Sequence, residues 1–226
     1  MKGIIIEGIS TSGKSSVLRH VQKRLQDEMP HSTKLFISEH YTQRMLEHAL
    51  ENNTLNSQMV KRHIDQMIDH LQMYQLMLDE AKFTLKPSGA QAFVTIERFL
   101  LTFLATQSGR VLKDYSLEDA GVQLDKLGKL NITQYIFVLS KDRLRKHIQR
   151  TLTHRNDQWV SYIEAKGGLD RMVDESMEWQ DNLLSLSESL KEVMPTKRIE
   201  ITNWDYKKVA DTIYNNEYRE CSNIKS

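Results

Sequence analysis

Short runs of consecutive apolar residues alternate along the chain with longer segments in which apolar residues recur every three or four positions. The first pattern is typical of buried strands in a parallel sheet, and the second of helices that cover such a sheet. The predicted strands are 3–7, 33–38, 92–96, 134–139 and 197–201. The predicted helices are 14–28, 41–52, 60–85, 99–107, 117–127, 142–151, 170–193 and 206–217. This alternation predicts an α/β fold, in which a five-stranded parallel sheet has helices on both faces.

The segment 60–85 has the longest periodic pattern. Its apolar residues alternate spacings of four and three, so they form one seam along a helix. The seam consists of Val60, Ile64, Met67, Leu71, Tyr74, Leu78, Ala81 and Leu85. A sustained coiled coil needs more repeats, so packing within the domain or across a dimer explains the seam better.

The composition indicates one globular domain. The chain has 226 residues, of which 39% are hydrophobic and 27% charged, and its net charge of +1 gives no large basic field for a nucleic acid polymer. The single cysteine, Cys221, excludes an internal disulfide framework and a cysteine-based zinc cluster. No stretch is long and apolar enough to span a membrane, and the start does not resemble a signal peptide. We therefore expect a cytoplasmic protein.

Residues 8–15 (GISTSGKS) match the phosphate-loop pattern G-x-x-x-x-G-K-[ST] in full. Gly8 and Gly13 permit backbone angles that gather N–H groups around an anion, and the helix that starts near Lys14 adds its positive dipole end. Lys14 would reach the β- and γ-phosphates, and the Ser15 hydroxyl would ligate Mg²⁺. The other residues expected to contact the phosphates are Ser10, Thr11, Ser12 and Ser16. A plain glycine-serine turn is the alternative, but the position between a strand and a helix favours ATP with Mg²⁺.

Four stretches resemble the thymidylate kinase and deoxynucleoside kinase group. Residues 4–16 (IIIEGISTSGKSS) resemble the start of these kinases, and residues 93–98 (FVTIER) the end of their third strand. Residues 71–74 (LQMY) are similar to a deoxynucleoside kinase stretch whose glutamine faces the nucleobase. Arg150 and residues 155–157 (RND) resemble the arginine-rich lid. The resemblance implies the P-loop nucleoside-triphosphate hydrolase fold over the whole chain.

Roles outside the loop follow from the strand ends and from this resemblance. Glu97, at the end of a predicted strand, would hold magnesium directly or through water, and Arg98 would bridge phosphate and acceptor. Glu39 follows another strand, and the resemblance implies that it is the general base for a 5′-hydroxyl. Glutamates that complement a helix dipole and a surface arginine are the alternatives.

The resemblance also implies an arginine-bearing lid over about residues 142–158. Arg150 and Arg155 would neutralise charge in the transition state, although a solvated basic helix face is the alternative. Gln72 would pair with a base edge, or is simply a solvated residue of its helix. The eight histidines show no metal-ligand spacing and are interpreted as ordinary.

Two departures from the family pattern concern the acceptor. His40 follows Glu39 where the family usually has proline, and Phe99 follows Arg98 where serine or tyrosine is usual. A nucleoside hydroxyl needs a base such as Glu39. A monophosphate is already anionic and needs extra cations, for which Arg44 and Arg98 are candidates.

The sequence therefore predicts a kinase that uses ATP and Mg²⁺. Its expected acceptor is a small molecule, either a (deoxy)nucleoside or a nucleoside monophosphate such as thymidylate. A P-loop kinase of another small hydroxyl compound, such as an antibiotic, is one alternative. A nucleotide-binding regulatory protein without acceptor chemistry is another, and it would not need Glu39 or the lid arginines. The oligomeric state stays open, although the related families form dimers and the long seamed helix could serve a homodimer.

Overall fold

A computed structural model describes residues 1–39, 41–42, 56–81, 91–107, 117–153, 157–165 and 167–219. Five parallel strands form one sheet in the order β2-β3-β1-β4-β5. The strands are β1 (Lys2–Glu7), β2 (Thr33–Ile37), β3 (Ala92–Glu97), β4 (Ile132–Val138) and β5 (Thr196–Glu200). The described helices are α1 (Lys14–Glu28), α3 (Ser57–Ala81), α4 (Leu100–Gln107), α5 (Leu117–Lys129), α6 (Lys141–Leu152), α7 (Asp157–Ala165), α8 (Gly168–Ser189) and α9 (Tyr206–Glu217). The predicted α/β class and parallel sheet are confirmed.

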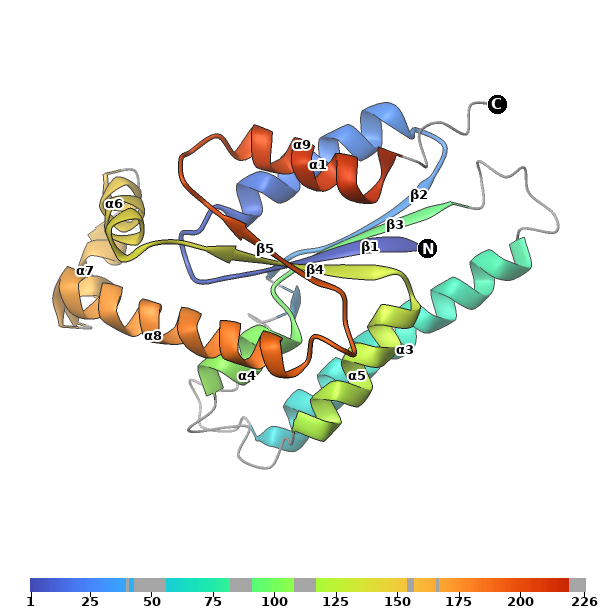
Figure 1. Cartoon of the computed structure of the whole chain (residues 1–226), viewed down its shortest axis with the longest axis horizontal. Coiled ribbons are helices and arrows are strands. Elements are labelled where there is room, and N and C mark those ends of the chain that lie inside the picture. Colours follow the sequence, from blue (N-terminus) through green and yellow to red (C-terminus); the bar gives the residue numbers. More distant parts are fainter. Residues whose placement is uncertain are drawn as a thin grey trace.

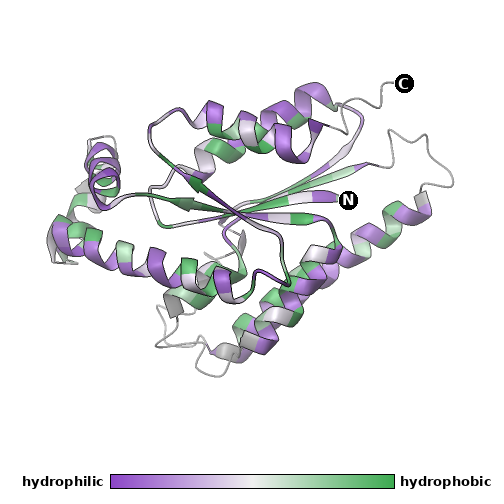
Figure 2. Cartoon of the chain, viewed as in Figure 1, coloured by the Kyte–Doolittle hydropathy of each residue, from purple (hydrophilic) through white to green (hydrophobic). Residues whose placement is uncertain are grey.

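Helices cover both faces of the sheet (Figure 1). Helices α1 and α9 lie on one face, and α3, α4, α5 and α8 lie on the other. Successive residues of a strand point to opposite faces, so Ile4 and Ile6 pack with α1 and α9 while Ile5 packs with α3, α4 and α5. Figure 2 shows these apolar strands between helices whose polar residues lie on the outside. The three central strands, β1, β3 and β4, are buried on both faces, which explains their largely apolar sequences, whereas the edge strands β2 and β5 are more exposed.

The carboxyl ends of the strands lie at one edge of the sheet. In the register of β1, Ile6 pairs with Glu97 of β3 and Glu7 pairs with Ile136 of β4. The segment that follows β1 therefore lies between the ends of its two neighbouring strands. Helices α6 and α7 lie beyond this same edge (Figure 1). Ligands of open parallel sheets bind at this edge, so the fold places the candidate site there.

Some predicted bounds were wrong. Strand β4 begins at Ile132 rather than at Gln134, because the polar Thr133 and Gln134 are buried like their apolar neighbours. Helix α7 was not predicted, since only Trp159 and Ile163 mark its inner face. Helix α8 begins two residues before the predicted range 170–193 and ends four residues before the end of that range.

Parts of two predicted helices lie outside the described residues. These are 43–52 of the predicted helix 41–52, and 82–85 of the predicted helix 60–85. Among the described helices, none combines the length and apolar character that a bilayer crossing requires.

Candidate functional site

The segment between β1 and α1 is a loop whose backbone requires glycine. Gly13 has a φ of 89°, in the left-handed region that residues with a side chain rarely adopt. A Cβ at Gly13 would lie 2.2 Å from Cε1 of Tyr206, the first residue of α9. The loop therefore folds tightly against α9, and the N-terminus of α1 points its free N–H groups into it.

Lys14 is folded back onto this loop. Its side chain is buried, and its Nζ donates hydrogen bonds to the Ile9 carbonyl oxygen at 2.7 Å and to Ser12 Oγ at 3.3 Å. Burial, and next the nearby Arg98 guanidinium, lower the pKa of Lys14 to about 7, while three neighbouring glutamates raise it. The loop thus holds a lysine whose charge would be restored by an anion.

Ser15 and Glu97 meet across the sheet edge. The Ser15 hydroxyl donates a hydrogen bond to Glu97 Oε1 at 2.5 Å. The Glu97 backbone carbonyl accepts one from the Thr42 hydroxyl at 2.8 Å. A hydroxyl and a carboxylate are hard oxygen ligands of the kind that Mg²⁺ prefers, usually together with phosphate oxygens and water. This donor set fits magnesium, and Ser15 and Glu97 are the residues that would hold it.

Arg98 links the end of β2 to the phosphate loop. Its Nη1 lies 2.7 Å from Glu39 Oε1, and its Nη2 donates to Ser10 Oγ at 3.0 Å. The guanidinium also lies over the Trp179 ring of α8, 5.3 Å from the ring centre. Three of the residues predicted from the sequence, Glu39, Arg98 and Ser10, are therefore brought together in one network.

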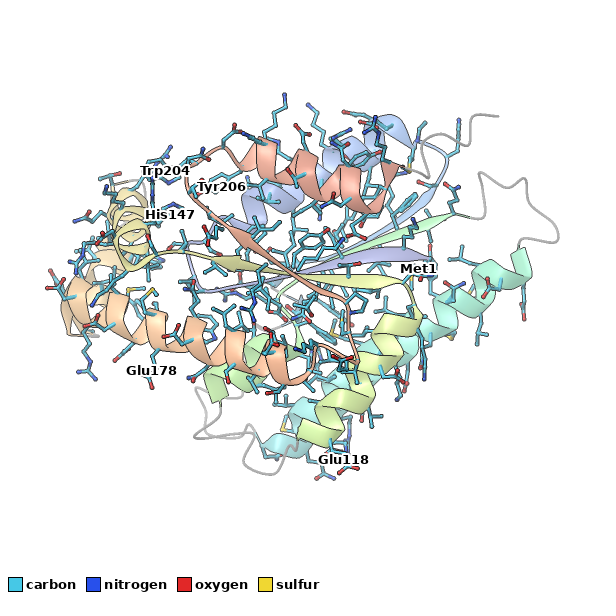
Figure 3. The ribbon with its side chains drawn as sticks, viewed as in Figure 1. Met1, Glu118, His147, Glu178, Trp204 and Tyr206 are labelled. Atoms are coloured by element: carbon cyan, nitrogen blue, oxygen red, sulfur yellow. The ribbon has the colours of Figure 1, made fainter. Side chains whose placement is uncertain are left out.

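A group of aromatic and cationic side chains closes the other side of the loop (Figure 3). His147 Nδ1 lies 3.0 Å from the Thr11 carbonyl oxygen; because a carbonyl only accepts, Nδ1 carries the proton. The His147 ring stacks on Trp204, with 5.2 Å between ring centres, and the Arg150 guanidinium lies 4.7 Å from the Trp204 ring centre. Burial lowers the pKa of His147, the Thr11 carbonyl raises it, and Arg143 and Arg150 lower it further. The neutral form of His147 is thus favoured beside the loop.

The sequence did not reveal His147 and Trp204 as part of this site. His147 was interpreted as ordinary, although it lies on the buried side of α6 with Leu144 and Ile148 and is 2% exposed. Its neighbour Trp204 follows β5, at the same strand edge as the loop, and this position was the available signal.

Other predicted residues do not join the network among the described residues. Gln72 lies one turn of α3 before Gln75, whose Oε1 accepts a hydrogen bond from the Met1 amine at 2.6 Å. Met1 lies at the opposite end of the sheet from His147 (Figure 3), so this part of α3 lies away from the phosphate loop, and the pairing of Gln72 with a base edge stays a prediction. Arg44 and Arg155 lie outside the described residues.

An apolar cavity of about 520 Å³ lies between β2 and α3. Neither the phosphate loop nor Arg98 lines it, but it extends to Ser38, the neighbour of Glu39. The cavity is lined by Lys34, Leu35, Phe36, Ile37, Ser38, Tyr41, Met67, His70, Leu71, Met73, Tyr74 and Met77.

Comparison with known proteins bears on the fold. No protein-family model matches the sequence, and no curated protein matches it either. One solved structure to which the chain is similar is that of YorR from Bacillus subtilis, crystallised in complex with phosphorylated GDP. The TM-score is 0.58 at 13% sequence identity, and the match covers 100% of this chain and 99% of that chain. With the parallel sheet and the loop after β1, this likeness confirms the predicted P-loop fold.

Proposed function

We propose that this protein is a kinase that transfers the γ-phosphoryl group of ATP, with Mg²⁺, to a (deoxy)nucleoside or a nucleoside monophosphate such as thymidylate. The observation that carries the proposal is the meeting of two pairs at the phosphate loop, Ser15 with Glu97 and Arg98 with Glu39. A loop that only binds a nucleotide has no need of the second pair. YorR, a protein of similar fold, was crystallised with a phosphorylated nucleotide, which supports a nucleotide ligand here.

The loop and Lys14 would hold the triphosphate. The free N–H groups at the start of α1 would donate to phosphate oxygens. Lys14 would give up its hydrogen bond to the Ile9 carbonyl oxygen and bind the β- and γ-phosphates instead. Bound Mg²⁺, held by Ser15 and Glu97, would offset phosphate charge. Because phosphoryl transfer asks mainly for positioning and charge stabilisation, these contacts supply most of what the reaction needs.

The nucleotide base would lie near Trp204. This indole is 38% exposed, and it is joined to the loop through His147 and the Thr11 carbonyl. Bases stack on exposed aromatic rings, and a guanidinium can cover the same ring face. Arg150 takes that place here, so nucleotide binding would free it to reach the phosphates.

The Glu39–Arg98 pair favours a hydroxyl acceptor over a phosphate acceptor. Glu39 offsets much of the Arg98 charge, so the pair presents little net positive charge to an incoming monophosphate. A hydroxyl acceptor instead needs a carboxylate base. Glu39 would act as this base, and Arg98 links it to the phosphate loop. On this basis a nucleoside is the first acceptor to test.

Another small hydroxyl compound, such as an antibiotic, would use the same groups. A nucleotide-binding regulatory protein is the second alternative, and it would retain Lys14 and Ser15 without any use for Glu39.

A panel of acceptors tests the proposal. Consumption of ATP is measured with nucleosides, nucleoside monophosphates and aminoglycosides, for the wild type and for Lys14→Ala. We expect at least one nucleoside or monophosphate to stimulate consumption by the wild type and none to stimulate the variant. ATP binding without stimulation by any nucleoside or monophosphate would contradict the proposal, and stimulation by an aminoglycoside alone would favour the antibiotic alternative.

A further inference from the structure

Glu7 is a buried carboxylate for which the proposed reaction has no direct use. It ends β1, directly before the phosphate loop, and is 1% exposed. Its Oε1 accepts a hydrogen bond from the Phe99 backbone N–H at 3.0 Å, and its Oε2 accepts one from the Thr102 hydroxyl. Burying a carboxylate is costly unless hydrogen bonds compensate. Both of these donors belong to the segment that follows Arg98.

The backbone of Arg98 is held from both sides by the end of β1. Arg98 has a φ of 52°, in the left-handed region that a residue with a side chain rarely adopts. Its own N–H donates to the Ile6 carbonyl oxygen at 3.0 Å, while Glu7 binds the N–H of the next residue, Phe99. Residues 6 and 7 thus fix an unfavourable backbone conformation at Arg98.

This backbone conformation sets the direction of the Arg98 side chain. The guanidinium bonds Ser10, three residues after Glu7, and Glu39 at the end of β2. Glu7 is therefore connected to the phosphate loop through Arg98. Glu7 binds the backbone next to Arg98, and the Arg98 side chain binds the loop. We infer that Glu7 is a positioning residue, which holds the turn at Arg98 so that the guanidinium points at the phosphate loop and at Glu39. Its effect on turnover rests on the proposed function, whereas its effect on Arg98 does not.

A carboxylate at the start of α4 also complements the helix dipole, and such a role alone would only stabilise the fold. Glu217 is a matched control for that simpler role. It is a carboxylate at the end of α9 that accepts hydrogen bonds from the Thr133 hydroxyl at 3.0 Å and from the Tyr135 hydroxyl at 2.5 Å. Glu217 ties a helix to a strand as Glu7 does, but it is not part of the site.

The experiment compares Glu7→Gln, Arg98→Ala, their double variant and Glu217→Gln. We expect Glu7→Gln to lower kcat by roughly 10-fold or more, with the nucleotide Kd changed by less than about twofold. In the Arg98→Ala background, Glu7→Gln should lower kcat no further, because the group that it positions is gone. Glu217→Gln should lower the melting temperature and leave kcat unchanged.

A second measurement does not depend on turnover. The guanidinium proton signals of Arg98 in NMR spectra, assigned by their loss in Arg98→Ala, should shift or broaden in Glu7→Gln and stay unchanged in Glu217→Gln. If no acceptor supports turnover but these signals change as expected, the proposed function fails and the positioning role stands. Unchanged Arg98 signals in Glu7→Gln would overturn the positioning role. It would also be overturned if the losses of kcat caused by Glu7→Gln and Arg98→Ala multiplied in the double variant.

Discussion

The Ser15 hydroxyl and the Glu97 carboxylate lie 2.5 Å apart although 82 positions separate them in the chain. Ser15 follows β1 and Glu97 ends β3, and the register of β1 with β3 brings the two strand ends together. The hydroxyl comes from the first turn of α1 and the carboxylate from the last residue of β3. A contact of this kind depends on rigid elements, so it presents two oxygen ligands at fixed positions.

Removal of the Glu97 carboxylate should weaken magnesium binding. Glu97→Gln keeps the size of the side chain but removes its charge, so the Mg²⁺ concentration for half-maximal turnover should rise by at least about tenfold. The measurement is turnover against Mg²⁺ concentration at saturating ATP. Glu178→Gln, an exposed glutamate of α8, is the control and should behave as wild type. An unchanged Mg²⁺ requirement in Glu97→Gln would remove Glu97 from the metal site.

The lowered pKa of Lys14 should make nucleotide binding depend on pH. In the free protein Lys14 loses its proton with a pKa of about 7, and bound phosphates would raise that pKa again. The complex then holds more protons than the free protein above that pH. Affinity should therefore fall by up to about tenfold per pH unit between about pH 7.5 and 9.

Calorimetric titrations in two buffers of different ionisation enthalpy measure this effect directly. At a pH above 8 they should show the uptake of nearly one proton per nucleotide bound. Lys14→Arg is the control, because an arginine stays charged throughout and its complex should take up none. A wild type that takes up no proton would show that Lys14 is already charged in the free protein.

Glu39→Gln should distinguish the two classes of acceptor. If Glu39 accepts the proton of a hydroxyl, the substitution should lower kcat by roughly 10²–10⁴ and leave ATP affinity nearly unchanged. The assay is single-turnover transfer to the best nucleoside found. A small effect would instead favour a monophosphate acceptor, for which the cation of Arg98 matters more than the carboxylate.

Much of the fold and part of the site could be predicted because their signals are local. The phosphate loop is a contiguous motif, and the predicted bounds of α1 and α9 match those of the structure. Glu39, Glu97 and the loop could be placed at one edge because parallel strands end together. The contact between His147 and Thr11, 136 positions apart, depends on how α6 folds back over the loop, and no periodicity encodes that.

The position of Gln72 shows what the apolar pattern of a helix leaves undetermined. The apolar seam gave the helix, but a contact also depends on how far along it a residue lies. Helix α3 has 25 residues and so spans about 37 Å, longer than the strands that it crosses. Because it runs back from the carboxyl edge, its second half with Gln72 lies near Met1. The direction in which α3 runs, rather than its apolar seam, decides at which edge of the sheet Gln72 lies.

Arg150 should leave Trp204 when a nucleotide binds. Its guanidinium lies over the indole in the structure, so binding should change the tryptophan emission. Trp204→Phe should abolish the change, whereas Trp159→Phe, on α7, should retain it.

Arg150→Ala should lower kcat by roughly 10²-fold and affect ATP affinity less. Equal losses of kcat and affinity would mean that Arg150 only binds the nucleotide.

Gln134 and Gln180 should respond in opposite ways to the same substitution. Gln134 is buried in β4, and neither its amide oxygen nor its amide nitrogen has a hydrogen-bond partner among the described residues. Gln180 is equally buried, but its amide accepts from the Leu139 N–H and donates to the Leu139 carbonyl, both at 2.9 Å. An unpaired buried amide destabilises the fold, whereas the loss of a paired one leaves the backbone of Leu139 unpaired. Gln134→Leu should therefore raise the free energy of unfolding, and Gln180→Leu should lower it, each by about 1–3 kcal/mol. Urea denaturation monitored by circular dichroism measures both changes, and destabilisation by Gln134→Leu would reveal an ordered water that pairs with this amide.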